Sequence, residues 1–346
     1  MKLAIVFGGE SYEHEISIVS AIALKKVISC ELVYIFCDKN RDFFLIPTDE
    51  INSKRFSSGE YLKDRKLSLK KGGFYTKKLF GIEQKVDFDV AINIIHGADG
   101  EDGKIASLFD FFGIKYIGPR IEGSVISYNK LFTKLYAKSL DVNVLNYEIV
   151  TQKNRKISLP LPVIIKPLRL GSSIGVGVVK EQDELEYALD VAFEYDDEVL
   201  VEPFIQNVAE YNIAGCKVGK NIIYSTIEEP QKNEFLDFEK KYMDFSRTQK
   251  VFEAKINEVI YSEIRKNFAK LYNSLFEGAI IRCDFFVIEN RVFLNEINPN
   301  PGSLANYLFE EFDSVIQSLA DALPKTKKID VDYRFINEIQ SAKGKA

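Results

Sequence analysis

Residues 282–302 read RCDFFVIENRVFLNEINPNPG. Two runs of strand-forming residues flank a polar break at residues 289–291, a pattern that predicts a β-hairpin. When the hairpin is centred on Asn290, Asp284 lies opposite Glu296. Like charges that face each other destabilise an antiparallel pair, so the hairpin needs a reason to bring these two carboxylates together.

The same register places Arg282 opposite Asn298. Because side chains alternate along a strand, the arginine, the asparagine and the two acids share one face. The hairpin is otherwise apolar, which indicates an interior strand pair, and a buried pair of acids needs a cation. Carboxylate and amide oxygens suit Mg²⁺, which usually shares its ligands with substrate phosphates, and Arg282 would then serve the transferring oxygens. The alternative is an ion-pair cluster in which Arg282 is the cation.

The composition is that of an ordinary soluble globular protein. The 346 residues, 46% hydrophobic and 28% charged, provide for two or three domains. A net charge of −5 argues against a nucleic-acid or anionic-membrane partner, and no apolar run approaches the ~18 residues of a membrane span. The cysteines lack metal-type spacing and are expected to be free thiols in a reducing compartment, the cytoplasm: Cys30, Cys37, Cys216 and Cys283.

Residues 1–118 alternate strand-like and helix-like segments, which predicts an α/β fold with a doubly wound parallel sheet. The lysine-rich stretch 51–81 interrupts this pattern and is expected to form a peripheral hairpin or loop. A second block covers residues 119–201. The third block, residues 202–346, contains further strands, a helix near 255–276 and the hairpin described above.

A glycine-rich segment, KPLRLGSSIGVGVV, spans residues 166–179 and lies between two predicted strands. Backbone N–H groups in such a loop can cradle phosphate oxygens, and Lys166 would supply positive charge. The segment lacks the G-x-x-x-x-G-K-[ST] order of a P-loop. A flexible hairpin turn explains the same glycines equally well.

Both histidines follow apolar strands, His14 in GGESYEHEIS and His96 in HGADGEDG. In a doubly wound sheet, ligands bind at the carboxyl ends of the strands, where both of these loops lie. The neighbouring acids are either part of that site or solvated loop residues and helix caps: Glu13, Glu15, Asp99, Glu101 and Asp102.

Taken together and in order, six motifs resemble those of the D-alanine–D-alanine ligases of the ATP-grasp superfamily: FGGESYEHEIS, HGADGEDG, VIIKPLRLGSSIGVGVV, EKKYMD, IIRCDFF and NEINPNPG. The resemblance covers nearly the whole chain. It implies a Rossmann-like substrate domain over residues 1–118, a central ATP-grasp domain over 119–201 and a C-terminal ATP-grasp domain over 202–346. ATP would lie between the antiparallel sheets of the second and third domains.

The resemblance also implies a nucleotide site. Lys130 and Lys166 match the lysines that contact the phosphates, and Glu210 matches the ribose-binding acid. The interdomain stretch that reads adenine corresponds to Glu202, Pro203, Phe204 and Ile205. The ligands of two Mg²⁺ ions, with Mn²⁺ as an alternative ion, correspond to Asp284, Glu296 and Asn298.

The amino-acid substrates are assigned by the same resemblance. Glu13, with Ser172, matches the acid that positions the amino group of the first D-alanine, and His96 lies in that pocket. Arg282 and the backbone N–H of Gly302 match an oxyanion-stabilising pair. The loop that closes over the site carries Lys241 and Tyr242.

The implied reaction has two steps. The carboxylate of one D-alanine attacks the γ-phosphate of ATP and forms an acyl phosphate, and the amine of a second D-alanine then expels phosphate. Tyr242 favours an amine acceptor over D-lactate, while another D-amino acid stays an alternative. A nucleotide-binding module without turnover is disfavoured because it needs no oxyanion donor such as Arg282, and a dehydrogenase is excluded because VFGGES lacks G-x-G-x-x-G. The product would serve peptidoglycan synthesis, and the family is commonly homodimeric.

The chain departs from the family at one place. Many relatives follow the Pro-Gly with a Ser-Leu pair that meets the carboxylate of the second substrate, whereas here the aligned residues are Tyr307 and Leu308. A tyrosine hydroxyl can donate the same hydrogen bond but reaches farther than serine. Tyr307 is therefore either a substrate contact or a packed aromatic.

Overall fold

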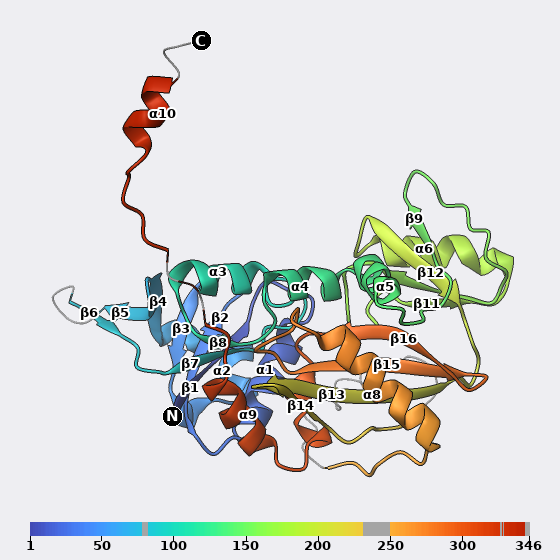
Figure 1. The fold of residues 1–346 in the computed structure, drawn as a ribbon, viewed down its shortest axis with the longest axis horizontal. Helices are drawn as coiled ribbons and strands as arrows, with labels where there is room; N and C mark the ends of the chain where they lie inside the picture. The colour runs from blue at the N-terminus through green and yellow to red at the C-terminus, as the bar shows by residue number, and fades with distance from the viewer. Residues whose placement is uncertain (78–81, 231–249, 326, 328, 343–346) are drawn as a thin grey trace.

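The computed structural model describes residues 1–77, 82–230, 250–325, 327 and 329–342. It contains three sheets, of eight, four and four strands, whose strands run in sequence over residues 2–117, 148–203 and 209–298. Figure 1 shows the three sheets side by side, with the two four-stranded sheets at the end opposite the chain's N-terminus. The mixed α/β class is confirmed.

The eight-stranded sheet has the order β6-β5-β4-β3-β2-β1-β7-β8. Its parallel half is built from β1 (Lys2–Gly8), β2 (Glu31–Cys37), β7 (Val90–Asn93) and β8 (Tyr116–Ile117). An antiparallel half follows with β3 (Phe43–Ile46), β4 (Arg65–Lys70), β5 (Gly73–Lys77) and β6 (Glu83–Lys85). The predicted parallel sheet is confirmed for the first half, and β4 and β5 form a hairpin within the stretch 51–81 that was predicted as a peripheral hairpin or loop. The antiparallel continuation through β3 and β6 was not predicted. The five residues between β2 and β3 are too few for a parallel crossover and permit only a hairpin.

The helices of the first part position the loops that end the parallel strands. They are α1 (His14–Leu24), the short α2 (Ser53–Ser57), α3 (Lys104–Phe112), α4 (Ile121–Tyr128) and α5 (Lys130–Ser139), with 3₁₀ turns at Thr48–Glu50 and Glu60–Lys63. Asn129 caps α5, since its side chain accepts hydrogen bonds from the N–H groups of Leu131 and Phe132. That cap fixes Lys130 as the first residue of the helix.

The second sheet is antiparallel, in the order β11-β10-β12-β9. Its strands are β9 (Glu148–Thr151), β10 (Val163–Pro167), β11 (Gly177–Val179) and β12 (Glu198–Pro203). Helix α6 (Leu185–Phe193), preceded by a 3₁₀ turn at Gln182–Glu184, buries its apolar face with this sheet.

The third sheet has the order β14-β13-β15-β16. Its strands are β13 (Ala209–Val218), β14 (Asn221–Tyr224), β15 (Ile281–Ile288) and β16 (Arg291–Asn298). Helix α8 (Glu258–Tyr272) packs on it through apolar residues at helical spacing, among them Ile260, Ile264 and Phe268. Each side chain of this size contributes about 1.5–3 kcal/mol when it is fully buried, so this stripe holds α8 against the sheet.

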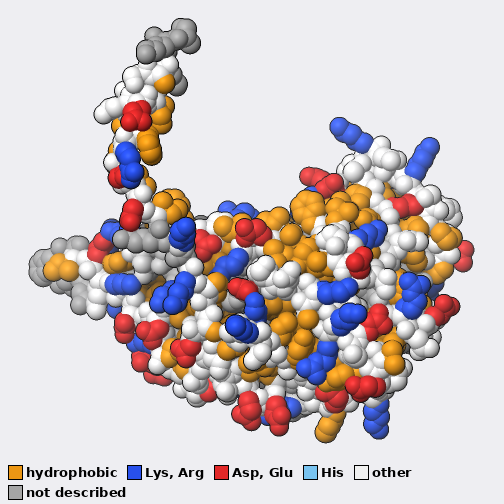
Figure 2. Space-filling model, viewed as in Figure 1, with side chains coloured by type: hydrophobic (Ala, Val, Ile, Leu, Met, Phe, Trp, Pro, Cys, Tyr) orange, Lys and Arg blue, Asp and Glu red, His pale blue; other side chains and the backbone are white. Residues whose placement is uncertain are grey.

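The chain ends with the 3₁₀ segment Gly302–Leu308, α9 (Phe312–Asp321) and α10 (Ile336–Ala342). Figure 1 shows α9 near the first sheet and α10 standing away from the body of the molecule. In the face shown in Figure 2, positive and negative side chains are interspersed. Among the described residues, none of the helices combines the length and apolar character that crossing a membrane requires.

The β15–β16 hairpin keeps the predicted register at its base, where Asp284 pairs with Glu296 and Arg282 with Asn298. The turn is one residue shorter than predicted, however. Ile288 pairs with Arg291 across a two-residue turn whose residues, at 289 and 290, both have positive φ (49° and 60°). A β-bulge between the turn and the base adds one residue to β16 and restores the register.

Candidate active site

Five segments of the chain converge on one small cavity of about 30 Å³. It is lined by Glu101 from the loop after β7, Lys130 from α5, Gly171 from the loop after β10, and Glu296 and Asn298 from β16, with Ser127 and Tyr128 of α4 among the other lining residues. The space suffices for on the order of two water molecules. The glycine-rich loop, the histidine loop and the hairpin, which lie far apart in sequence, therefore meet here.

The four polar groups of the hairpin share one face, as predicted. Arg282 donates from Nε and Nη2 to the two carboxylate oxygens of Asp284, at 2.7 Å each. Asn298 Nδ2 lies 3.0 Å from Asp284 Oδ2 and 3.4 Å from Glu296 Oε1. Burial is the main cause that raises the pKa of Asp284, and the charge of Glu296 adds to it, while Arg282 opposes the rise. Arg282 thus neutralises one acid of a pair.

These residues fit a divalent cation. Within the described residues, no three or more His, Cys, Asp or Glu side chains form a metal-binding group, so the donors available are two carboxylates and one amide. All three can offer hard oxygen atoms of the kind that Mg²⁺ takes. Asp284 and Asn298 already touch, although the amide would have to turn so that Oδ1 replaces Nδ2. Burial and the neighbouring charge of Glu296 raise the pKa of Asp284, and a divalent cation between the two acids would favour their charged forms.

Lys130 and Lys166 both lie close enough to Glu296 for its charge to act on them. Lys130 Nζ donates to the carbonyl oxygen of Leu170, and burial lowers its pKa. Lys166 Nζ lies 2.9 Å from Glu202 Oε2 and 3.2 Å from Asn295 Oδ1. Asn295 is the extra residue that the bulge adds to β16, so the irregularity in the hairpin joins the third sheet to the lysine of the second.

Glu202 is buried, with 1% of its surface exposed. Its carboxylate pairs with Lys166 on one oxygen and with Lys134 on the other. Although burial opposes its charge, the two lysines hold the pKa of Glu202 below its usual value. Lys134 is a site residue that sequence reasoning missed. The signal was present, because Lys130 and Lys134 are four residues apart on one predicted helix and share a face.

The rest of the predicted adenine stretch follows Glu202 at the end of β12. Pro203 is the last residue of the strand and pairs with Val163. The N–H of Phe204 donates to the carbonyl oxygen of Pro162 at 2.9 Å, and Ile205 follows it. Glu210 lies on β13 opposite Phe286, and its charge helps to raise the pKa of Lys166.

Glu13 and Ser172 are brought together from segments 159 residues apart, and Ser172 Oγ donates to Glu13 Oε1. The other carboxylate oxygen, Oε2, is buried and has no hydrogen-bond partner among the residues that the structure describes. Burial and the charge of Glu101 raise the pKa of Glu13 to about 7. Side chains would not fit beside it, since a Cβ at Gly97 would lie 2.5 Å from Oε2 and one at Gly171 would lie 3.0 Å from Oε1.

His96 is buried next to this acid. Its Nε2 lies 3.0 Å from Ser20 Oγ, and its Nδ1 lies 3.5 Å from Glu101 Oε1. Burial lowers the pKa of His96 to about 4, so the ring is neutral at pH 7. Burial also raises the pKa of Glu101 to about 8. Glu101 lines the cavity, and the sequence left it undecided between a site residue and a helix cap because the acids before a helix have both uses.

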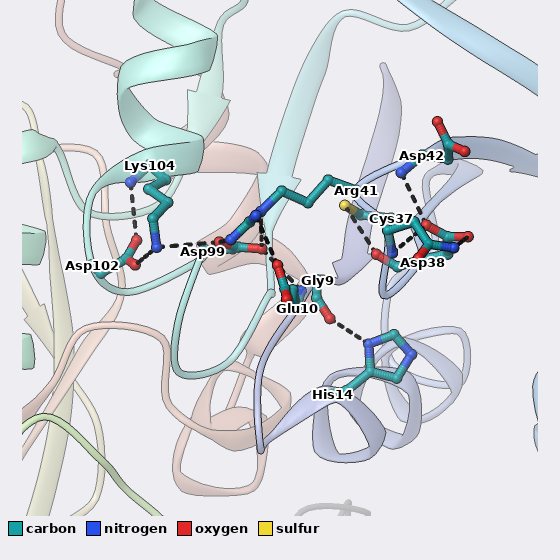
Figure 3. A network of polar contacts seen from close by, with 11 residues as sticks. Gly9, Glu10, His14, Cys37, Asp38, Arg41, Asp42, Asp99, Asp102 and Lys104 are labelled. Atoms are coloured by element: carbon teal, nitrogen blue, oxygen red, sulfur yellow. Dashed lines mark hydrogen bonds and ion pairs between the residues drawn. The ribbon is translucent and has the colours of Figure 1, made fainter. Parts of the chain in front are cut away.

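His14 lies outside this group. It begins α1, its Nδ1 is 2.6 Å from the carbonyl oxygen of Gly9, and its ring packs edge-on against Phe36. Figure 3 shows it below a network of charged residues at the ends of β1, β2 and β7. The described contacts of His14 are those of a structural residue.

The segment after the hairpin packs on α1. The N–H of Ser303, next to Gly302, donates to Ser20 Oγ at 3.1 Å. Tyr307 (7% exposed) and Leu308 (1%) belong to the hydrophobic core, and the phenol of Tyr307 lies close enough to Arg282 to contribute to the raised pKa of that guanidinium. Tyr307 is thus a packed aromatic with a polar end near the acid pair. Lys241 and Tyr242 lie outside the described residues.

Two protein-family profiles match the chain, one described as D-ala D-ala ligase N-terminus over residues 2–119 and the other as D-ala D-ala ligase C-terminus over residues 136–312. The chain is 57% identical to the D-alanine--D-alanine ligase of Campylobacter lari and 58% identical to that of Wolinella succinogenes, over 100% of each chain. The crystal structure of D-alanine-D-alanine ligase from Helicobacter pylori superposes with a TM-score of 0.85 at 49% identity, covering 94% of this chain and 100% of that one.

Proposed function

This chain belongs to the D-alanine–D-alanine ligase family, and from that premise we propose that it joins two D-alanine molecules with ATP through an acyl phosphate. In the first step, a carboxylate oxygen of one D-alanine attacks the γ-phosphorus and ADP leaves. In the second step, the amine of the other D-alanine attacks the acyl carbon, loses a proton and expels inorganic phosphate. The dipeptide serves as a precursor of peptidoglycan.

The observation that carries this proposal is the acid pair beside the lysines. Asp284 and Glu296 face each other with Arg282 as their arginine partner, and Lys130 and Lys166 flank them. Asp284, Glu296 and Asn298 would hold two Mg²⁺ ions, or Mn²⁺, which neutralise phosphate charge when bound. A triphosphate next to this cluster would meet cations from two sheets.

Arg282 would act on the transferring oxygens. Its bidentate pair with Asp284 already fixes the plane of the guanidinium. The backbone N–H of Gly302 would be the second donor to the oxyanion that forms on the acyl carbon. The loss of one such donor costs about 3–4 kcal/mol of transition-state stabilisation in comparable enzymes.

Glu13, Ser172 and His96 would bind the first D-alanine. The unpartnered Oε2 of Glu13 is an acceptor without a donor, and an ammonium group has three donors to offer. Ser172 holds the other oxygen in place. Because His96 is neutral at pH 7, it can border this subsite without repelling the ammonium group.

Lys134, Lys166 and Glu202 would order the phosphate end of the nucleotide site. Lys166 is held between Glu202 and Asn295, and Lys134 holds Glu202 from the other side. The adenine would meet the chain from Glu202 to Ile205 and the ribose would meet Glu210. In this arrangement, residues 1–118, 119–201 and 202–346 act as substrate, central and C-terminal domains.

Lys241 and Tyr242 would close the site and keep water from the acyl phosphate. Tyr242 favours D-alanine over D-lactate as acceptor. Tyr307, whose phenol lies near Arg282, would act on the second substrate by way of that arginine. Leu308 is packed in the same hydrophobic core. We further propose that the enzyme works in the cytoplasm as a homodimer with small-molecule substrates, and with neither nucleic acid nor a membrane as partner.

A phosphate-release assay tests the proposed function. The enzyme receives ATP, Mg²⁺ and one D-amino acid at a time, or D-alanine with D-lactate, and the product mass is determined. We expect phosphate release with D-alanine alone and the mass of D-alanyl-D-alanine at neutral pH. Phosphate release that needs another amino acid, or depsipeptide formed as fast as dipeptide, would contradict the proposal.

A further inference from the structure

A second charged network lies at the carboxyl ends of β1, β2 and β7 (Figure 3). It includes none of the residues assigned to the first substrate. Its centre is Asp99, which is 3% exposed. Arg41 donates to it twice, from Nε to Oδ2 at 3.0 Å and from Nη2 to Oδ1 at 2.9 Å. Lys104 Nζ lies 3.3 Å from Oδ1.

Asp99 also binds the backbone of the loop that leads to Glu13. The N–H of Glu10 donates to Asp99 Oδ2 at 2.9 Å, and Arg41 Nη1 reaches the side chain of Glu10 at 2.7 Å. On its own side, the carbonyl oxygen of Asp99 accepts from the N–H of Ile105 at 2.9 Å, which joins the loop to α3. One carboxylate therefore connects three separate turns of the first sheet.

The two loops that Asp99 joins carry the first-substrate residues. Glu10 precedes Glu13 by three residues, and Asp99 lies between His96 and Glu101. Glu13 has a hydrogen bond from Ser172 on only one oxygen, while Oε2 has no hydrogen-bond partner. Its distance from His96 and Glu101 therefore depends on how the two loops are held together.

We propose that Asp99, clamped by Arg41, is a positioning residue that sets the spacing between Glu13 and His96 in the subsite for the first D-alanine. The inference rests on the proposed function. Neither Asp99 nor Arg41 would touch substrate. Their effect reaches the reaction only through the geometry of the two loops.

The pair of Arg41 and Asp99 differs from an ordinary surface ion pair. Arg41 has a 52% exposed side chain, and an exposed pair contributes little to stability. Asp99 is buried, however, and its acceptors are filled by a backbone N–H as well as by the guanidinium. Although burial opposes its charge, these hydrogen bonds hold the pKa of Asp99 below its usual value. The Asp99 carboxylate is therefore charged, and its hydrogen bonds connect the loops around it.

The test compares four single variants, and the double variant Asp99→Asn/Arg41→Gln, by steady-state kinetics with D-alanine and ATP. Asp99→Asn keeps the shape but removes the charge, Arg41→Gln removes the clamp and Arg41→Lys keeps only its charge. Asp42→Asn is the matched control, because Asp42 lies in the same β2–β3 turn as Arg41 and its side chain pairs with Lys66 of β4 instead of with Asp99.

We expect the KM for the first D-alanine to rise about tenfold in Asp99→Asn and Arg41→Gln, as the loss of a charged hydrogen bond predicts. The KM for ATP should stay within about twofold, Arg41→Lys should fall between wild type and Arg41→Gln, and Asp42→Asn should match wild type. The double variant should be no worse than the poorer single variant by more than about twofold, because both changes break one pair.

An unchanged KM for D-alanine in Arg41→Gln would overturn the inference, and so would a parallel rise in the KM for ATP. If Asp99→Asn does not fold, Arg41→Gln decides, since its half-exposed side chain can be replaced without opening the core. Wild-type turnover with D-alanine tests the proposed function separately. If the wild-type enzyme does not turn over D-alanine, the proposed function fails before any variant is compared.

Discussion

Two buried aspartates of this protein each bind one arginine through both carboxylate oxygens, yet their environments differ. Asp284 meets Arg282 at 2.7 Å on both oxygens, and Asp99 meets Arg41 at 3.0 and 2.9 Å. Asp284 also faces a second acid, Glu296, and its pKa is raised. Asp99 instead has a second cation and a backbone N–H, and its pKa is lowered.

The difference distinguishes a carboxylate that can bind a ligand from one whose role is structural. Around Asp99, the protein supplies the partners that a buried carboxylate needs. Around Asp284, it places a second acid, Glu296, whose repulsion a bound cation would offset. Burial alone does not distinguish the two places, since both aspartates are 3% exposed. The partners of each carboxylate do.

The largest expected effect follows from removing a charge from the acid pair. Asp284→Asn should lower kcat by about 10³-fold or more, because the cation ligand is lost while phosphate charge still has to be neutralised. The melting temperature and the circular dichroism should stay near those of wild type. Phosphate release measures the loss, and Glu289→Gln, at the exposed tip of the same hairpin, is the control. Unchanged turnover in Asp284→Asn would remove the metal assignment.

The same substitution at the two arginines should give unlike results. Arg282→Lys keeps the charge but loses the planar fork, and we expect kcat to fall about 10²–10³-fold as for a lost oxyanion donor. Arg41→Lys should leave kcat within about twofold, because that arginine touches no reacting group. Parallel kinetics at saturating substrates measure both. Equal losses of kcat in Arg282→Lys and Arg41→Lys would contradict the distinction between a ligand site at Asp284 and a structural carboxylate at Asp99.

A third prediction uses the pH dependence of stability. The pKa of Glu13 is about 7 in the folded protein and its ordinary value is 4.5, so the proton is held more tightly when folded. The stabilisation that protonated Glu13 contributes to the wild-type fold is therefore complete below pH 4.5, and it is lost as the pH rises through 7. Glu13→Gln should raise the free energy of unfolding by about 1–3 kcal/mol at pH 8 and by much less at pH 4.5.

The pH dependence of stability expected from Asp99 has the opposite sign. Its folded pKa lies below the ordinary value of 3.8, so its charge stabilises the fold above that pH. Asp99→Asn should lower the free energy of unfolding by about 1–3 kcal/mol at pH 7. Thermal unfolding of both variants over a range of pH checks the pair of signs. A Glu13→Gln protein that is less stable than wild type at pH 8 would show that Glu13 is not an uncompensated buried acid.

The smallest effect is expected at Tyr307. Tyr307→Phe keeps the packing in the core but removes the polar end that lies near Arg282. We expect a fall in kcat/KM for the second D-alanine of about threefold, comparable with the loss of a weak hydrogen bond. A loss of 100-fold would mean that the hydroxyl binds the substrate carboxylate directly.

Much of the hairpin could be predicted from sequence, because strand alternation alone places Asp284 and Glu296 on one face. The pairing at its base was right although the turn was wrong. The turn closes one residue earlier than predicted, and the bulge at Asn295 compensates. A bulge leaves no periodic signal in sequence, so its contact with Lys166 could not be foreseen.

Strands β3 and β6 of the first sheet and the role of Lys134 were missed for different reasons. Strand β3 is apolar but only four residues long, and β6 has three residues, all exposed, so neither gives a recognisable alternation. Lys134 had a readable position on α5, but only the fold brings Glu202 to it. Partners that come from distant segments decide whether a charged residue is buried, and a single sequence does not reveal them.

The arrangement of Glu13, Ser172 and His96 shows the same limit. Their loops could be placed at strand ends, and the family resemblance named their roles. Only the structure shows that Glu13 Oε2 lacks a hydrogen-bond partner while Asp99, close by, is fully bonded. Those roles stay predictions until the substrate is seen in place.

The most direct measurement is a crystal structure with Mn²⁺ and a non-hydrolysable ATP analogue, in which anomalous scattering locates the metal. We predict anomalous peaks at coordination distance, about 2.0–2.3 Å, from oxygens of Asp284, Glu296 and Asn298, with the triphosphate completing the ligands. A bound nucleotide with no metal between the facing acids, and with Asp284 neutralised by Arg282 alone, would contradict the cation site on which the proposed function depends.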